Sequence, residues 1–117
     1  MFVPQTAFMT DGSIRDQIHY PLQAIGPMDS TELVRLSEIL QILDLKFEKI
    51  DRPLPVKRYE QFSPGEVQRI ALARVMFHRP RLVVLDEATS AIAEEIEEHF
   101  YEYIQQHAIT PVTVAHR

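Results

Sequence analysis

Two adjacent carboxylates stand directly after a short aliphatic run in this sequence. Leu82-Val83-Val84-Leu85 is followed by Asp86-Glu87. A carboxylate at the end of a buried strand can bind Mg²⁺ or its waters, and a neighbouring carboxylate can take a proton from an attacking water. The pair therefore predicts phosphoryl chemistry, with Asp86 as the candidate metal ligand and Glu87 as the candidate general base.

Three further positions fit the same chemistry. Gln5 offers an amide oxygen to a metal ion or a water, and His116 can donate a hydrogen bond to a γ-phosphate or orient that water. Ser63-Pro64-Gly65-Glu66 predicts a helix start, where unpaired backbone N–H groups attract anions. Each feature is common by itself, since most such segments are plain helix caps or surface residues. Only their combination and order are specific.

The hydrophobic pattern indicates the elements that would position these groups. Apolar runs at 1–5, 81–85 and 111–115 are typical of strands. The expected helices begin at Ser13, Asp29, Ser63 and Ala93 and run to about Ile18, Leu43, His78 and His107. This order predicts an α/β fold with a parallel sheet. Ligands of such sheets bind beyond the carboxyl ends of the strands, so Gln5, Asp86-Glu87 and His116 would face one crevice.

Some local expectations are more specific. Asp29 and Glu32 have the spacing of a capping box, and Leu33 opens a row of leucines expected to face the core. The run 82–85 is apolar on both faces, which indicates a strand buried on both sides. The stretch 46–61 contains two prolines and alternating charges, and we interpret it as an extended linker.

Composition excludes several classes of protein. The 117 residues carry a net charge of -5 with acids and bases interspersed, which argues against broad binding to nucleic acid or to anionic membrane surfaces. There is no cysteine, so disulfides and thiolate metal sites are excluded. No apolar run approaches the roughly 20 residues of a spanning helix, and the start of the sequence does not read as a secretory signal.

The longer motifs resemble those of ABC-type ATPases. Residues 62–69 are similar to the ABC signature and its following Gln-Arg, and residues 82–91 are similar to Walker B and the start of the D-loop. Val3-Pro4-Gln5 resembles the Q-loop, and residues 114–117 resemble the switch-histidine segment. The resemblance covers essentially the whole chain. It implies a P-loop NTPase, with a partial RecA-like parallel sheet core and an ABC α-helical subdomain.

The resemblance also implies an organisation and partners. Residues from about 11 to 78 would form the helical subdomain, with 1–10 and 79–117 in the core. Such domains bind ATP and Mg²⁺ and pair head to tail, so that the signature of one covers ATP held by the other. A transmembrane domain of a transporter would contact the Q-loop, and no nucleic-acid partner is implied.

The site residues take separate roles under this resemblance. Glu87 would be the general base, and His116 would sense the γ-phosphate. Gln5 and Asp86 would serve Mg²⁺. The residues expected to contact nucleotide are Gln5, Ser63, Gly65, Glu66 and Asp86.

A narrower resemblance comes from residues 10–18 with Tyr20-Pro21, and from the Ser-Pro-Gly-Glu form of the signature. These segments are similar to subfamily D, the peroxisomal and lysosomal half-transporters and their bacterial relatives. That group implies transport of fatty acyl-CoA or cobalamin-type cargo. It also implies a place on the cytosolic face of a membrane, the peroxisomal membrane among them.

The sequence departs from the family in places that affect its chemistry. It contains no Gly-x-x-x-x-Gly-Lys-Ser/Thr motif, so we expect the chain to begin after Walker A and to hydrolyse ATP negligibly by itself. Pro64 replaces the first signature glycine and has no N–H to offer to phosphate, and Phe62 replaces the usual leucine. Ala93 stands where many D-loops carry Asp, which puts the usual cross-dimer contact in doubt.

Two alternatives stay open. The chain could be a truncated, non-catalytic remnant that acts only as a half-site or interaction module. It could instead be a soluble ABC ATPase of the DNA-repair type. That class inserts a long coiled coil before the signature, whereas the segment between Gln5 and Ser63 is short and has few sustained heptads.

Overall fold

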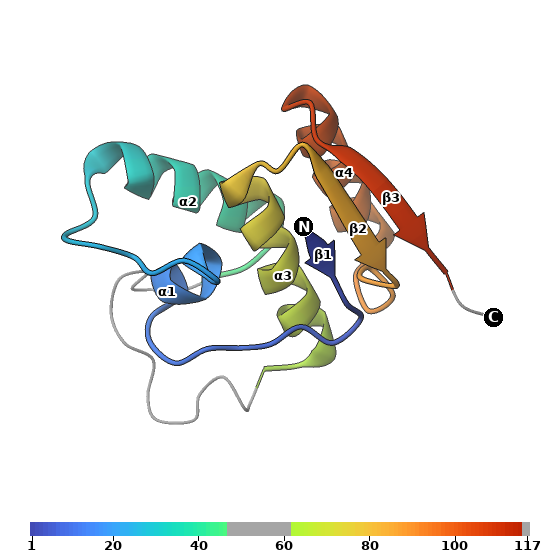
Figure 1. Cartoon of the computed structure of the whole chain (residues 1–117), viewed down its shortest axis with the longest axis horizontal. Coiled ribbons are helices and arrows are strands. Elements are labelled where there is room, and N and C mark those ends of the chain that lie inside the picture. The colour runs from blue at the N-terminus through green and yellow to red at the C-terminus, as the bar shows by residue number, and fades with distance from the viewer. Residues whose placement is uncertain (47–61, 116–117) are drawn as a thin grey trace.

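A computed structural model of the chain describes residues 1–46 and 62–115. Three strands, β1 (Phe2–Val3), β2 (Leu82–Asp86) and β3 (Thr110–Val114), form a parallel sheet in the order β1-β2-β3. Val3 lies opposite Leu85, and Asp86 lies opposite Val114. The predicted α/β class with a parallel sheet is confirmed (Figure 1). The linker predicted for 46–61 lies outside the described residues except for its first position.

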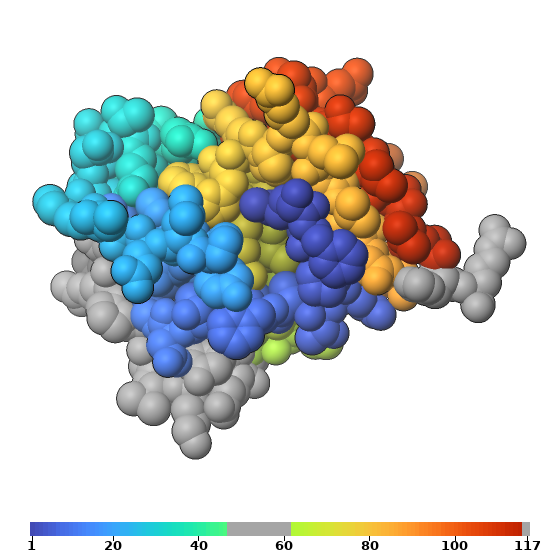
Figure 2. All heavy atoms as spheres, in the orientation of Figure 1, coloured from blue at the N-terminus to red at the C-terminus, as the bar shows by residue number. Residues whose placement is uncertain are grey.

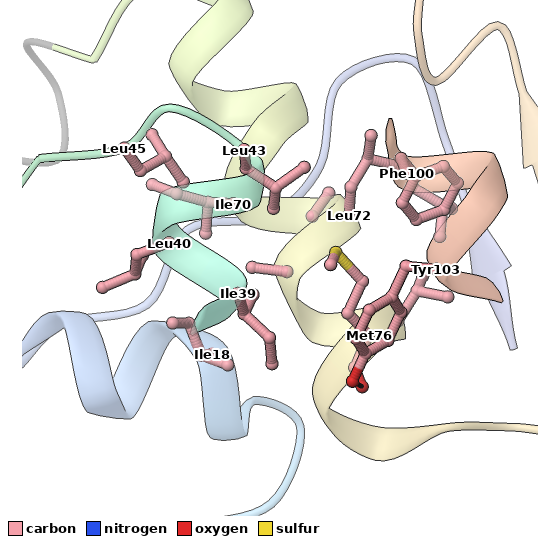
Figure 3. Packing of buried hydrophobic residues seen from close by; sticks show 14 of the residues in the cluster. Ile18, Ile39, Leu40, Leu43, Leu45, Ile70, Leu72, Met76, Phe100 and Tyr103 are labelled. Atoms are coloured by element: carbon pink, nitrogen blue, oxygen red, sulfur yellow. Dashed lines mark hydrogen bonds between the residues drawn. The ribbon is translucent and has the colours of Figure 1, made fainter. Parts of the chain in front are cut away.

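Four helices complete the described part of the chain: α1 (Ile14–His19), α2 (Ser30–Ile42), α3 (Pro64–His78) and α4 (Glu94–Gln106). Helix α3 runs through the middle of the molecule, between α1 and α2 on one side and the sheet with α4 on the other (Figure 1). Its residues from Ile70 to Met76 are buried and meet side chains of the neighbouring helices, including Ile39 and Phe100 (Figure 3). The core is therefore built around α3.

The start and end of α3 follow from local sequence. The Ser63 hydroxyl accepts a hydrogen bond from the Glu66 N–H, and the Glu66 carboxylate accepts one from the Ser63 N–H, which completes the predicted capping box. Pro64 occupies the first helical position, where no N–H is needed. Arg79 adopts a left-handed conformation before Pro80 and ends the helix.

Helix α2 corrects two details of the sequence analysis. The Asp29 carboxylate caps it by accepting from the Glu32 N–H, but the Glu32 side chain binds Arg15 and His19 instead of returning to the cap. Only half of the expected capping box therefore forms. The Leu33 side chain is 43% exposed, so the buried row of α2 begins one turn later, at Leu36.

The strands also differ from expectation. Val83 and Leu85 are buried in the core shared with α3 and α4, whereas Leu82 is 49% exposed. Burial of β2 on both faces, as predicted, is therefore wrong for the described residues, because the helices that share its core meet only the Val83–Leu85 face. Strand β1 ends at Val3, so Gln5 lies two residues beyond the strand and not at its end.

Candidate functional site

The loops after β1 and β2 leave the sheet at the same edge. The two strands run parallel with Val3 opposite Leu85, so Gln5 and Glu87 both follow the carboxyl ends of neighbouring strands. Gln5 is exposed, and Asp86 and Glu87 are half-buried. Gln5, Asp86 and Glu87 therefore lie at the same edge of the sheet, the edge at which ligands of parallel sheets bind. His116 lies outside the described residues.

The backbone at Glu87 has an unusual conformation. Asp86 is the last residue of β2, and the Glu87 N–H donates to the Val114 carbonyl at 3.0 Å. Glu87 then adopts a left-handed conformation with φ of 51°. Residues other than glycine rarely do so, and such positions cluster at functional sites. The turn aims the chain from β2 back toward the start of α3.

The start of α3 offers one backbone donor. Pro64 has no N–H, and the Glu66 N–H is used by the Ser63 hydroxyl. Among the described residues, the Gly65 N–H meets no acceptor. A side-chain carbon on Gly65 would lie 2.9 Å from the Ala91 carbonyl oxygen, so this position requires glycine. Gly65 thus serves two purposes, close packing and a free donor in the first turn.

Gln68 connects these segments, although its residue type and position predicted no role for it. Its amide group bonds to the Gln5 carbonyl, to the Ser90 hydroxyl and to the Ala91 N–H. The sequence did contain a signal, because Gln68 belongs to the Gln-Arg pair that follows the signature motif. A glutamine on the buried face of a helix must find hydrogen-bond partners.

A cavity of about 290 Å³ lies between the same segments. Its lining comes from the loop after β1, the first turns of α3 and the turn after β2: Gln5, Thr6, Phe62, Pro64, Val67, Gln68, Ser90 and Ala91. The structure therefore brings Gln5 beside the signature segment. Ser63, Gly65 and Glu66 are sequence neighbours of lining residues but do not line the cavity. Asp86 and Glu87 come earlier in the turn that leads to Ser90 and do not line it either.

The side-chain oxygens at this edge of the sheet are suited to a magnesium ion whose other ligands are phosphate oxygens and waters. Within residues 1–46 and 62–115, no group of three His, Cys, Asp or Glu side chains could hold a metal. Mg²⁺ at nucleotide sites needs only one or two protein oxygens besides waters and phosphates. The Asp86 carboxylate and the Gln5 amide oxygen fit that requirement.

A second, larger hollow of about 530 Å³ opens on the other side of the β1 loop. Figure 2 shows it between the start of the chain and the segment around Tyr20, with α3 at its floor. Arg74 lines it, with its guanidinium 4.8 Å from the Tyr20 ring centroid. Burial lowers the pKa of Arg74 to about 10, an effect partly opposed by Tyr20.

Comparison with known proteins shows the family of this chain. Residues 1–90 match the family model described as ABC transporter. The chain belongs to the ABC transporter family. It is part of the family's ATP-binding domain, and such a domain implies ATP binding. None of the helices in the described ranges of this ABC chain is long and apolar enough to cross a membrane.

The curated relatives of this ABC chain include members of subfamily D. Human lysosomal cobalamin transporter ABCD4 is 38% identical over all of the chain and 20% of that protein. ABC transporter D family member 1 of Arabidopsis thaliana is 34% identical over 99% of the chain and 9% of that protein. Mouse ATP-binding cassette sub-family D member 3 is 32% identical over 99% of the chain and 18% of that protein. The chain thus spans a fifth or less of the length of these relatives, and the predicted subfamily D resemblance is confirmed.

Solved structures agree on the fold. A bacterial Atm1-family ABC exporter with ATP bound superposes with a TM-score of 0.72 at 23% sequence identity. The match covers 99% of this chain and 20% of that exporter chain. The three-stranded parallel sheet and its helices therefore form a fragment of the ABC ATPase fold, as predicted from the sequence.

Proposed function

We propose that this chain is the ATP-hydrolysing part of a subfamily D ABC transporter, and that it supplies the Q-loop, signature, Walker B and D-loop segments. The observation that supports this most is the small cavity between the Q-loop, signature and D-loop segments. Gln5, Pro64 and Ala91 come from three separate segments and line one space. A site for phosphoryl transfer needs such convergence, because its catalysis depends on positioning and charge stabilisation.

Each site residue has a role in this proposal. Glu87 takes the proton of the attacking water, and His116 contacts the γ-phosphate. Asp86 and Gln5 offer oxygens to Mg²⁺, which would neutralise charge on the phosphates. Ser63, Gly65 and Glu66 meet ATP held by a partner domain, through the helix start and the Gly65 N–H.

The proposal requires two partners. The phosphates need a Gly-rich loop with its Lys, which these 117 residues do not contain, so that loop comes from a segment outside them. A second ABC ATPase domain pairs with this one across the signature. Residues from about 11 to 78 act as the helical subdomain, and 1–10 with 79–117 act as part of the core.

The larger hollow supports a contact with the transporter's transmembrane domain. It is mostly apolar, it borders the loop after β1, and the Phe8 side chain at its rim is 63% exposed. A helical end of the membrane domain that covered Phe8 would bury this surface, which is otherwise costly to leave in water. A movement of that domain at Phe8 would then be passed along the backbone to Gln5, three positions earlier in the chain.

The group of relatives supports a proposal for the cargo. We infer transport of fatty acyl-CoA or cobalamin-type molecules across a peroxisomal or lysosomal membrane, with this domain on the cytosolic face. One relative's name specifies cobalamin and a lysosome. Uptake assays in vesicles with labelled cobalamin and labelled fatty acyl-CoA would separate the two cargoes.

The test of the proposed function is reconstitution of ATP hydrolysis. This chain, a separately made segment with a Walker A strand and loop, and their mixture are assayed with ATP and Mg²⁺. Turnover should appear only in the mixture. Equal turnover by the chain alone would contradict the proposal, and no turnover in a mixture shown to associate would favour a non-catalytic interaction module.

A further inference from the structure

Gln68 uses every hydrogen-bonding group of its side chain on two separate loops, the loop after β1 and the turn after β2. Its amide nitrogen lies 3.1 Å from the Gln5 carbonyl oxygen, 3.0 Å from the Ser90 hydroxyl and 3.3 Å from the Glu87 carbonyl oxygen. Its amide oxygen accepts from the Ala91 N–H at 2.8 Å. A glutamine amide has two N–H donors, so the three acceptors share two hydrogens.

Burial of Gln68 makes the loss of any of these hydrogen bonds costly. Gln68 is 3% exposed, so water cannot replace a bond that is lost. Ser90 and Ala91, which bind the Gln68 side chain, belong to a turn that α3 also contacts through Gly65. The Ala91 peptide is thereby fixed on both sides, its N–H by Gln68 and its carbonyl by close packing on Gly65.

The same side chain contacts the backbone of Glu87. That residue has a left-handed conformation, which persists only where surrounding groups hold it. Its N–H is held by the Val114 carbonyl of β3, and its carbonyl faces the Gln68 amide of α3. The peptides before and after Glu87 therefore have separate anchors on two different elements.

We propose that Gln68 is a positioning residue for hydrolysis. It holds the backbone of Glu87 and joins the loop after β1 and the turn after β2 to α3, so that both segments move with the helix that carries the signature. It acts through the backbone of Glu87. This inference rests on the proposed function for its catalytic part, and on the hydrogen bonds alone for its structural part.

The expected kinetic effect is on turnover and not on affinity. A general base must stay within hydrogen-bond reach of its water, and misplacement by 1 Å can cost on the order of 100-fold in rate. ATP is held mainly by the phosphate-binding loop, which these 117 residues do not contain. Replacement of Gln68 should therefore lower kcat about tenfold or more and leave KM for ATP within about twofold.

The structural part is tested on the full chain by amide hydrogen exchange. In Gln68→Met, which keeps the length of the side chain and removes its hydrogen bonds, exchange at Glu87 and Ala91 should rise on the order of tenfold, while α2 and α4 stay protected. Gln41→Met, at an exposed position of α2, is the matched control and should change neither amide. Unchanged exchange at both amides in Gln68→Met would overturn the proposal.

A second variant covers the case in which Gln68→Met does not fold. Gln68→Glu keeps an oxygen for the Ala91 N–H but has no donor for the Gln5 and Glu87 carbonyls. Because the retained oxygen accepts from the Ala91 N–H, that amide should stay protected in Gln68→Glu. Loss of its protection would contradict the assigned hydrogen bond.

The catalytic part is tested by kcat and KM in the mixture with the Walker A segment. A fall in kcat with KM preserved supports positioning, whereas a change in KM alone, or a kcat that is normal per folded molecule, overturns it. If the unaltered mixture hydrolyses no ATP, the proposed function fails, and hydrogen exchange still decides whether Gln68 holds Glu87.

Discussion

A side-chain carbon on Gly65 would lie 2.9 Å from the carbonyl oxygen of Ala91. The first turn of α3 therefore rests directly on the turn after β2, and the fold permits no larger residue there. The neighbouring atom is backbone, so it cannot swing away as a long side chain could. This contact joins the signature segment to the D-loop within one chain.

Gly65→Ala should therefore destabilise the chain although alanine favours helices. The added carbon forces the turn at Ala91 away from α3, with an expected loss of about 1–3 kcal/mol in the free energy of unfolding. Urea unfolding followed by circular dichroism measures it. Ser37→Ala, at an exposed site of α2, is the control and should be neutral. A Gly65→Ala chain as stable as the unaltered one would show that the two turns do not touch.

Arg74→Lys should also be costly despite the retained charge. The guanidinium donates to the Gln17 carbonyl at 2.7 Å and to the Gln17 side-chain oxygen at 3.3 Å, and it stacks over Tyr20. A lysine ammonium cannot reproduce this planar geometry. We expect a loss of about 1–3 kcal/mol in unfolding free energy, whereas Arg81→Lys at an exposed position should change it by less than about 0.5 kcal/mol. Equal effects of the two substitutions would contradict the assigned contacts.

Glu32→Gln should loosen α1 from α2. The Glu32 carboxylate binds Arg15 through two contacts of 2.6 and 3.1 Å and lies 3.0 Å from the His19 ring nitrogen. Neutralising it leaves the largely buried Arg15 without its counter-charge, and we expect thermal unfolding at pH 7 to show a loss of about 2–4 kcal/mol. Glu38→Gln on the exposed side of α2 is the matched control. A loss no greater than that of the control would argue against a supporting role for this ion pair.

Ala93→Ser should stabilise α4. Ala93 is the N-cap of that helix and provides no side-chain hydrogen bond, so the first turn keeps an unpaired N–H group. A serine hydroxyl would accept from it, with an expected gain of about 0.5–1 kcal/mol in unfolding free energy. The gain is measured by urea unfolding, with Ala24→Ser in a loop as the control. A loss of stability would mean that Ala93 is required for packing.

Much of the fold could be predicted from local signals. Ser63, Pro64 and Glu66 define a helix start by their hydrogen-bonding capacity, and both the start and the end of α3 appear where these residues and Pro80 require them. The order of apolar runs predicted the parallel sheet. Leu33 was wrongly expected to face the core. Helical spacing identifies an apolar face of a helix but does not say which residues of that face contact the rest of the protein.

The residues of the candidate site could be predicted from the sequence, but the hydrogen bonds that join their segments could not. The motifs identified Gln5, Gly65 and Glu87 one by one. The hydrogen bonds through which Gln68 joins their loops are contacts between segments far apart in the chain, and no local spacing encodes them. The Arg15–Glu32 pair was missed for the same reason, because the side chain expected to complete a cap found a partner on another helix.

The measurement that tests the central claim most directly is the turnover of Glu87→Gln in the mixture with a Walker A segment. Glu98→Gln, an exposed carboxylate on α4, serves as the matched control. Loss of the general base should lower kcat by about 100-fold or more with ATP binding retained, and the control should keep the unaltered rate. A Glu87→Gln mixture that hydrolyses ATP within about twofold of the unaltered rate would contradict the account, since that change is far below the effect of removing a general base.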